Sequence, residues 1–212
     1  MMKKAVIFDL DGTLWDSVSV ITEAWNEVFS ERAPGRETLT EERMRSLMGK
    51  TLPEFSTALL PDKSPEEGLD ILGECCRREV TFIERKGAKL YPGVPETLRE
   101  LSVRYSLYIV SNCEDGYIQA FLDYYDARPL FEGFLSFGDT HLDKDENILY
   151  LIEKYGIDRA VYVGDTEKDR LCTRKAGLPF IHAAYGFGDV AECDEKIDSF
   201  SELPQKAEKI LG

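Results

Sequence analysis

The sequence is poor in the residues that build zinc sites, disulfide frameworks and membrane spans. Its 212 residues include two histidines and five cysteines. The cysteines form no CxxC pair and are odd in number, which argues against a zinc site and a disulfide framework and favours a reducing cytoplasm. No apolar run approaches the roughly 20 residues that a membrane-spanning helix needs. The apolar run near the start ends at Asp9, too early for a signal peptide.

Basic residues are outnumbered by acidic ones. Lys and Arg total 26 against 40 Asp and Glu, a formal net charge of −14. A chain of this charge repels nucleic acid and anionic membranes, so we expect neither as a partner. An anionic substrate then needs a local positive feature, such as a metal ion. The length suits one large domain, or a core with a smaller subdomain, and leaves the oligomeric state open.

Strand-like and helix-like segments alternate along most of the chain. Short β-branched or aromatic runs occur at AVIFDL (5–10), LYIVSN (107–112), EGFLSF (132–137), AVYVGD (160–165) and LPFIHAAY (178–185). Helical patterns lie between them, at PETLRELSVRY (95–105), DENILYLIEKY (145–155) and TEKDRLCTRKA (166–176). This alternation predicts βαβ units and a doubly wound, Rossmann-like parallel sheet of the α/β class.

One interval, from about residue 16 to residue 87, has no convincing strand pattern. Its apolar residues recur at helical spacing, first at Val18, Ile21, Trp25 and Val28. We therefore predict an all-helical cap subdomain at 16–87, inserted after the first strand. The core domain then comprises residues 1–15 and 88–212.

A long helix is predicted in the second half of this interval. Ser64 is placed as its N-cap, Pro65 as its first residue and Glu67 as the partner in a capping box, and Gly87 could end it. One face is expected to carry the apolar residues Leu69, Leu72, Cys76, Val80 and Ile83.

Polar side chains follow three of the predicted strands. They are Asp9 and Asp11, Ser111 and Asn112, and Asp165 and Asp169. Ligands of open α/β sheets bind at the carboxyl ends of strands, near the switch in strand order. Carboxylates that converge there cannot all stay ionised without a counter-ion. We predict Mg²⁺, which favours carboxylate oxygens and retains waters that a phosphate can displace.

Asp9 and Asp11 stand two residues apart. If the strand pattern continues to this point, both side chains point into the site while Leu10 faces the core. One carboxylate could then attack an electrophile while the other donates and later accepts a proton. Gly12 and Thr13 open a turn whose amides can bind phosphate oxygens.

Four segments together resemble a known family. They are DLDGTLWDS (9–17), YPGVPETLRELS (91–102), VSN (110–112) and GDTEKD (164–169). In this order and spacing the chain resembles the haloacid dehalogenase-like hydrolases, and within them the phosphoglycolate phosphatase and β-phosphoglucomutase branch. The resemblance covers nearly the whole chain.

The resemblance implies a role for each residue at the first two motifs. Asp9 would be the nucleophile that forms an aspartyl-phosphate. Asp11 would protonate the leaving oxygen and then activate water. Ser111 would hydrogen-bond the transferring phosphoryl group, with Asn112 beside it.

The same resemblance implies a Mg²⁺ site. Asp165, Asp9 and the backbone carbonyl of Asp11 would ligate the ion, and Asp169 would support the site. The family also uses a lysine that neutralises the phosphate and the nucleophile. Lys144 in HLDKDENI (141–148) is our candidate, although Asp145 stands where most relatives have proline.

Two further lysines complete the predicted site. Lys168 is the alternative to Lys144 as the neutralising lysine. The family's substrate-contacting loop of the cap falls near SLMGKTLPEF (46–55), where Lys50 is predicted to touch the substrate, with Arg45 behind it. The substrate itself stays open among phosphoglycolate, a sugar phosphate and a nucleotide.

The leading interpretation is a Mg²⁺-dependent phosphatase of a small phosphorylated metabolite. A phosphosugar mutase on the same scaffold is the alternative. Because β-phosphoglucomutases carry a histidine in the first cap helix where this chain has Ile21, we expect net phosphate release. His141 and His182 lie outside the cap and are expected to be structural or exposed.

Two other functions fit the motifs less well. A non-catalytic module that accepts phosphate without turning it over, as receiver domains do, has no inserted cap and no counterpart of Asp11. A haloacid dehalogenase needs no Mg²⁺ and has no use for Asp11.

Overall fold

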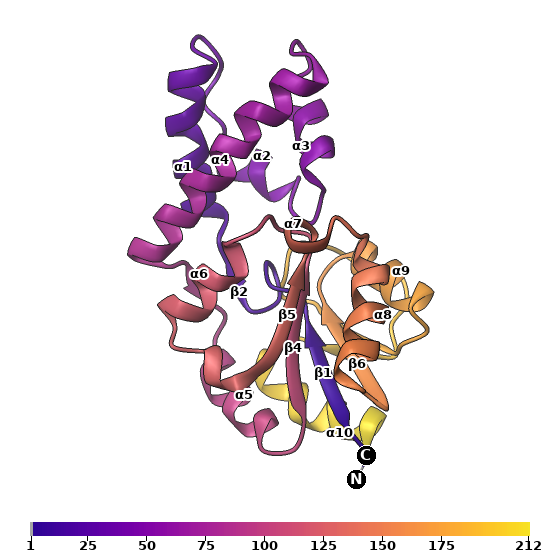
Figure 1. Cartoon of the computed structure of the whole chain (residues 1–212). Helices are drawn as coiled ribbons and strands as arrows, with labels where there is room; N and C mark the ends of the chain where they lie inside the picture. The colour runs from indigo at the N-terminus through magenta and orange to yellow at the C-terminus, as the bar shows by residue number, and fades with distance from the viewer. Residues whose placement is uncertain (1) are drawn as a thin grey trace.

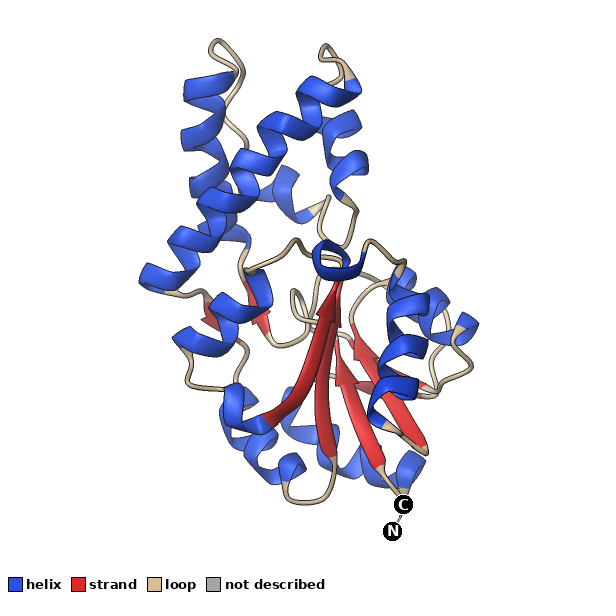
Figure 2. Cartoon of the chain, in the orientation of Figure 1, coloured by secondary structure: helices blue, strands red, loops and turns tan. Residues whose placement is uncertain are grey.

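A six-stranded parallel sheet forms the centre of the computed structural model, which describes residues 2–212 (Figures 1 and 2). The strand order is β5-β4-β1-β6-β7-β8. The strands are β1 (Lys4–Phe8), β4 (Ser106–Ser111), β5 (Phe131–Ser136), β6 (Arg159–Gly164), β7 (Phe180–Ala183) and β8 (Glu195–Ile197). The predicted doubly wound α/β sheet is therefore confirmed.

β1 lies between β4 and β6, and Ile7 pairs with Tyr108 on one side and Tyr162 on the other. The chain passes from β1 to β4 and β5, then crosses to β6 on the opposite side of β1. The switch in strand order thus falls at the carboxyl end of β1, where ligand sites of open α/β sheets form.

Helices cover both faces of this sheet. On one face α8 (Lys144–Tyr155) packs beside α9 (Glu167–Lys175), and Ile148 of α8 joins Ile7 in one apolar cluster. On the other face α5 (Val94–Ser102) and α10 (Leu203–Leu211) pack against alternate strand residues such as Val6 and Phe8. The core also contains α6 (Tyr117–Tyr124), α7 (Phe137–Thr140) and the 3₁₀ turns Arg128–Leu130 and Phe200–Glu202.

The other four helices lie beyond the carboxyl ends of the strands (Figure 1). They are α1 (Val18–Arg32), α2 (Glu41–Arg45), α3 (Leu52–Leu59) and α4 (Pro65–Lys86), together called the cap. Short strands β2 (Trp15–Asp16) and β3 (Lys89–Leu90) pair antiparallel where the chain leaves and re-enters the core. An all-helical insertion after the first strand is confirmed, whereas domain limits at residues 16 and 87 remain a prediction.

The start and end of α4 follow the predicted signals. The Ser64 hydroxyl accepts a hydrogen bond from the Glu67 amide at 3.2 Å, Pro65 is the first helical residue, and Gly87 ends the helix with φ 61°. The Glu67 carboxylate lies 3.4 Å from the Lys63 ammonium. That ion pair takes the place of the predicted capping box.

The expectation that Leu69 belongs to the buried face of α4 is wrong. Leu69 is 37% exposed, whereas Gly68 beside it is buried. α3 packs so closely there that a Cβ on Gly68 would lie 2.1 Å from the Ser56 hydroxyl. The contact with α3 therefore passes through the glycine, and the leucine faces outward.

β8 and the β2–β3 pair were not predicted, because strands of two or three residues are too short to show a period. Of the helices in residues 2–212, none combines the length and apolar character needed to cross a membrane.

Candidate active site

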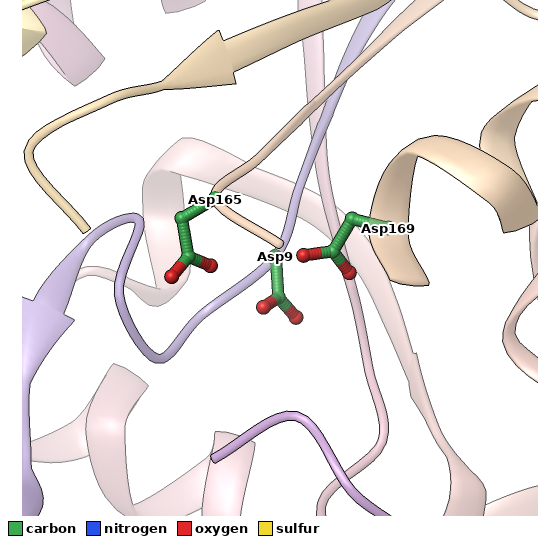
Figure 3. Close-up of side chains that lie close together, drawn as sticks. All are labelled: Asp9, Asp165 and Asp169. Carbon is green, nitrogen blue, oxygen red and sulfur yellow. The ribbon is translucent and has the colours of Figure 1, made fainter. Parts of the chain in front are cut away.

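Three carboxylates converge at the carboxyl ends of β1 and β6 (Figure 3). Asp9 directly follows β1, Asp165 directly follows β6, and Asp169 lies in the first turn of α9. All three are buried, and one oxygen of each lies within 4.8 Å of the others. The predicted convergence of Asp9, Asp165 and Asp169 is therefore present in the structure.

A capping box positions Asp169. The Thr166 amide and hydroxyl donate to Asp169 Oδ2 at 3.0 and 2.6 Å, and the Asp169 amide donates back to the Thr166 hydroxyl at 3.2 Å. These bonds leave Oδ1 of Asp169 to face the other charges. The helix start thus orients one carboxylate of the site.

Lys144 supplies a buried positive charge to the cluster. Its ammonium lies 2.9 Å from Asp9 Oδ1 and 2.5 Å from Asp169 Oδ1, and the residue is 3% exposed. α8 begins at Lys144. Asp145, which stands where most relatives have proline, is the second residue of that helix. Lys168 instead forms a surface ion pair with Glu54 of the cap at 3.2 Å. Of the two candidates, Lys144 is the one beside Asp9.

Burial makes the ionisation of these carboxyls unequal. It raises the pKa of Asp9 to about 7, against the attraction of the Lys144 ammonium. Burial and the charges of Asp169 and Asp9 raise the pKa of Asp165 well above its usual range. Burial opposes ionisation of Asp169 as well, yet Lys144 and the bonds from Thr166 lower its pKa. One lysine is therefore too little positive charge for three carboxylates.

The residues present fit a divalent cation. Asp165 Oδ2 accepts a hydrogen bond from the Phe187 amide at 2.7 Å, but its buried Oδ1 has no partner among residues 2–212. A buried polar atom without a partner is costly, and such exceptions often mark a bound ion. A cation such as Mg²⁺ would satisfy this oxygen and supply the charge that Lys144 does not.

The turn after Asp9 brings the chain against Asp165. Gly12 has φ +80°, and a Cβ there would lie 2.1 Å from Asp165 Oδ2, so only glycine fits. The Gly12 amide donates to the Trp15 carbonyl at 2.9 Å and the Thr13 amide to the Leu10 carbonyl at 3.3 Å. The loop's own bonds occupy both amides in this conformation, and their role in phosphate binding stays a prediction.

Asp11 lies outside the cluster of three carboxylates. Its Oδ1 accepts hydrogen bonds from Trp15 Nε1 at 2.9 Å, from the Tyr117 hydroxyl at 2.8 Å and from the Ser17 hydroxyl. Burial raises the pKa of Asp11 while these three donors oppose the shift. A raised pKa suits a group that carries a proton to a leaving group. Leu10 between the two aspartates is fully buried in the core, as predicted.

A cavity of about 70 Å³ lies between the strand ends and the cap. From the core it is lined by Asp9, Asp11, Ser111, Asn112 and Lys144. The structure thus brings together in one cavity five residues that the sequence singled out.

The cap forms the other side of this cavity. Lys50 and Ile21 line it, and the Asn112 side chain donates to the Gly49 carbonyl at 3.1 Å, which joins core and cap. Lys50 is exposed at the cavity edge. Arg45 lies elsewhere: it pairs with Asp16 at 2.8 Å and its guanidinium sits 4.9 Å from the Phe187 ring.

Two cavity residues, Glu79 and Tyr117, were missed by sequence reasoning. Tyr117 begins α6, far along the chain from its partner Asp11. Glu79 lies on the buried face of α4, where an acid among apolar residues was the available signal. His141 is exposed and His182 is buried in β7, in accord with the expectation for both.

Comparison with known proteins agrees with this geometry. The model of the haloacid dehalogenase-like hydrolase family matches residues 6–183. A phosphoglycolate phosphatase of Agrobacterium fabrum is 31% identical over 223 residues, covering 97% of this chain and 93% of the relative. One of Rhodobacter capsulatus is 31% identical over 215 residues, covering 96% of each.

Solved structures share the fold over nearly the full length. CbbY from Rhodobacter sphaeroides, in complex with phosphate, superposes with a TM-score of 0.80 at 25% identity, covering 96% of each chain. A haloacid dehalogenase-like family hydrolase from Streptococcus pneumoniae gives 0.79 at 25% identity, covering 96% of this chain and 98% of its own. The chain belongs to the haloacid dehalogenase-like hydrolases and is a phosphatase of that family.

Proposed function

We propose that this protein is a Mg²⁺-dependent phosphomonoester hydrolase of a small phosphorylated metabolite, acting through an aspartyl-phosphate on Asp9. The observation that carries the proposal is the position of Asp9, which lines the cavity beside Lys144, Asp165 and Asp169. Relatives named phosphoglycolate phosphatase and a similar structure solved with phosphate support a phosphate ester as the substrate.

Asp9, Asp165 and the Asp11 backbone carbonyl would hold the Mg²⁺, with Asp169 supporting them. Bound Mg²⁺ supplies the positive charge that allows an anionic phosphoryl group to approach a carboxylate. Asp169 also forms an ion pair with Lys144. The lysine and the metal would therefore together balance the negative charge of the three carboxylates.

In the first step a carboxylate oxygen of Asp9 attacks phosphorus and the bond from phosphorus to the leaving oxygen breaks. Asp11 gives its proton to that oxygen, and the alcohol departs. Ser111 and Lys144, which line the cavity with Asp9, bind the phosphoryl oxygens.

In the second step Asp11, now ionised, takes a proton from water while the water oxygen attacks phosphorus. The bond between phosphorus and Asp9 breaks, which releases phosphate and restores the Asp9 carboxylate. Trp15, Ser17 and Tyr117 hold Asp11 in place through both steps.

Hydrolysis, rather than the mutase reaction, is favoured by Ile21. This apolar residue lines the cavity, and it cannot engage Asp11 by hydrogen bonding. Asp11 is then free to activate water whenever Asp9 is phosphorylated. A mutase would instead convert β-glucose 1-phosphate to glucose 6-phosphate in the presence of the bisphosphate, faster than it releases phosphate.

The test is phosphate release from a panel of small phosphomonoesters, in Mg²⁺, in excess chelator, and after Mg²⁺ is restored. We expect turnover that chelator abolishes and Mg²⁺ recovers. Equal turnover in excess chelator would rule out the metal site, and isomerisation faster than phosphate release would rule out the hydrolase.

A further inference from the structure

An exposed arginine of the cap contacts the core. Arg45 lies on α2, and its guanidinium is 2.8 Å from Asp16 Oδ2 and 4.9 Å from the centre of the Phe187 ring. Phe187 follows β7 in the core, and Asp16 is the last residue of β2. The proposed chemistry uses none of these three side chains, so their arrangement asks for an explanation of its own.

Asp16 connects Arg45 with the start of the cap. It lies in β2, which pairs with β3 where the chain leaves and re-enters the core, and we call this pair of strands the hinge. Asp16 Oδ1 accepts a hydrogen bond from the Val18 amide at 3.1 Å, and Val18 begins α1. Asp16 Oδ2 accepts the bond from Arg45. The ion pair therefore holds α2 against the same hinge residue that starts α1.

Phe187 connects Arg45 with the carboxylate cluster. Its amide donates a hydrogen bond to Asp165 Oδ2 at 2.7 Å. The glycines on either side let the loop lie this close, since a Cβ on Gly186 would be 2.3 Å from Asp165 Cβ and one on Gly188 would be 3.0 Å from the Asp165 carbonyl oxygen. A loop packed so tightly cannot shift without disturbing its bond to Asp165. The position of the Phe187 ring and the orientation of the Asp165 carboxylate are therefore linked.

A cation at Asp165 would strengthen this link. Asp165 Oδ1 is buried without a partner among residues 2–212, whereas Oδ2 is bound to the Phe187 amide. A carboxylate with a cation on Oδ1 keeps one orientation, and it then also fixes the Phe187 amide and ring. The guanidinium of Arg45 lies over that ring, where the face of an aromatic group attracts a cation. The metal site and the cap are thus joined through two side chains.

We propose that Arg45 couples the position of the cap to the metal site. Mg²⁺ at Asp165 stabilises the cap in the position seen here, and by reciprocity the contact of Arg45 raises the affinity for Mg²⁺ by the same factor. Arg45 is a positioning residue that acts on Asp165 through Phe187. The cap is then seated most firmly over the cavity when the metal needed for phosphoryl transfer is present. This inference rests on the Mg²⁺ site of the proposed function.

Other contacts hold the cap when Arg45 is removed. The Asn112 side chain donates to the Gly49 carbonyl at 3.1 Å, and Lys168 pairs with Glu54 at 3.2 Å. We therefore expect a protein without Arg45 to fold and to retain its cavity. The effect of the substitution is a change in Mg²⁺ affinity rather than a loss of binding.

The first test is calorimetric titration of the full chain with Mg²⁺. Arg45→Met removes the charge and keeps most of the side-chain length, and we expect it to raise the Kd for Mg²⁺ about threefold to fivefold. Arg43→Met is the matched control, because Arg43 is exposed on the same helix and donates to the Ala58 carbonyl within the cap at 3.2 Å. It should leave the Kd unchanged. Equal Kd values for Arg45→Met and the wild type would overturn the proposal.

A double-mutant cycle tests the route through the ring. Phe187→Leu keeps the backbone amide that binds Asp165 and removes the aromatic face. It should raise the Kd for Mg²⁺, and adding Arg45→Met to it should raise the Kd no further. Effects of the two substitutions that multiply independently would contradict coupling through the contact of Arg45 with Phe187.

Hydrogen exchange tests the response of the cap, and its first comparison needs no variant. We expect Mg²⁺ to slow amide exchange about threefold in residues 41–51 of the wild type and of Arg43→Met, and not in Arg45→Met. Mg²⁺ that binds the wild type without slowing exchange there, or that slows it equally in Arg45→Met, would overturn this inference and leave the proposed function standing. Failure of Mg²⁺ to bind the wild type would overturn both.

Discussion

Single residues at the site carry charges that depend on one another. Lys144 is buried between Asp9 and Asp169, whereas Lys168 is half-exposed and pairs with Glu54 on the surface. Breaking a buried ion pair leaves an uncompensated charge, while a surface pair contributes little. The two lysines therefore form a matched pair for mutation.

We expect Lys144→Met to lower the free energy of unfolding of the metal-free protein by about 3–5 kcal/mol, because two buried carboxylates lose their cation. Phosphate release should fall by about 10²-fold or more. Lys168→Met should cost less than about 1 kcal/mol and leave turnover unchanged. Denaturant titration measures the free energy of unfolding, and a phosphate assay measures turnover. Similar effects of the two substitutions would contradict the assignment of Lys144 as the lysine that neutralises the site.

Glu79 gives a pH dependence of stability with a defined sign. Its pKa is about 8 in the folded protein against 4.5 ordinarily, so between these values the unfolded chain loses a proton that the folded protein keeps. The wild type should therefore lose stability relative to Glu79→Gln as pH rises from 5 to 8, by about 1.4 kcal/mol per pH unit, with no further change above pH 8.

Denaturant unfolding of both proteins from pH 5 to 9 checks this, and Asp9 and Asp165 drop out of the difference because both proteins contain them. Glu84→Gln is the control, since that residue is exposed on the same helix. A difference between wild type and Glu79→Gln that does not vary with pH would show that Glu79 is ionised in the folded protein.

The motif residues could be predicted from the sequence, and their partners from distant segments could not. Asp9, Asp165 and Asp169 each follow a strand whose pattern is plain, so their convergence follows from the parallel sheet. Tyr117 is 106 positions from Asp11, and Glu79 is 54 positions from Trp25. Such contacts depend on how helices pack, and no local pattern encodes them.

At the scale of elements, the turn between β1 and β2 determines how closely the chain approaches Asp165. Gly12 and Gly35 both have positive φ, +80° and +87°, but a Cβ on Gly35 would meet no atom within 4 Å. A side chain at Gly35 would therefore cost only the backbone strain of a positive φ. A side chain at Gly12 would add a steric clash with Asp165.

We expect Gly35→Ala to lower the free energy of unfolding by about 1 kcal/mol and to leave turnover unchanged. Gly12→Ala should cost more, lower turnover, and reduce the rise in melting temperature on adding Mg²⁺, because its Cβ displaces Asp165. Melting curves with and without Mg²⁺ measure this. Equal behaviour of the two variants would mean that the Gly12 contact is unimportant.

The long elements were predictable because their periods extend over several residues, and all five predicted strands are present in the sheet. The prediction of buried residues failed where burial depends on how a neighbouring helix packs. Leu69 has the right spacing for the buried face of α4, yet α3 contacts Gly68, since a glycine permits the closer approach. The spacing of apolar residues indicates which face of α4 is buried. The packing of α3 determines which residues of that face are covered.

Taken as a whole the protein is acidic, and we propose that it binds an anionic substrate between its core and its cap. The formal charge is −14, so the proposed metal site and a few lysines would have to attract the substrate. Asn112 and Gly49 join core and cap across the cavity, and Lys50 lies next to that contact.

We expect Lys50→Ala to lower kcat/KM unequally among natural phosphomonoesters and to change little for a generic aryl phosphate, because Lys50 is proposed to contact the non-reacting end of the substrate. Lys63→Ala, elsewhere on the cap, should alter none of the values. Measurement of kcat and KM for each ester tests this prediction. An equal loss of kcat/KM on every substrate would mean that Lys50 binds the phosphate or stabilises the cap.

We propose that Asp9 accepts the phosphoryl group and that Asp11 activates the water that removes it. Acetyl phosphate tests this directly, since acetate departs without needing a proton, so Asp11→Asn should block only the second step. We expect acid-quenched Asp11→Asn protein to carry one phosphoryl group on Asp9, located by mass spectrometry of its peptides, and Asp9→Asn protein to carry none. A phosphoryl group on another residue, or turnover by Asp9→Asn within about tenfold of the wild type, would contradict the role of Asp9 as nucleophile.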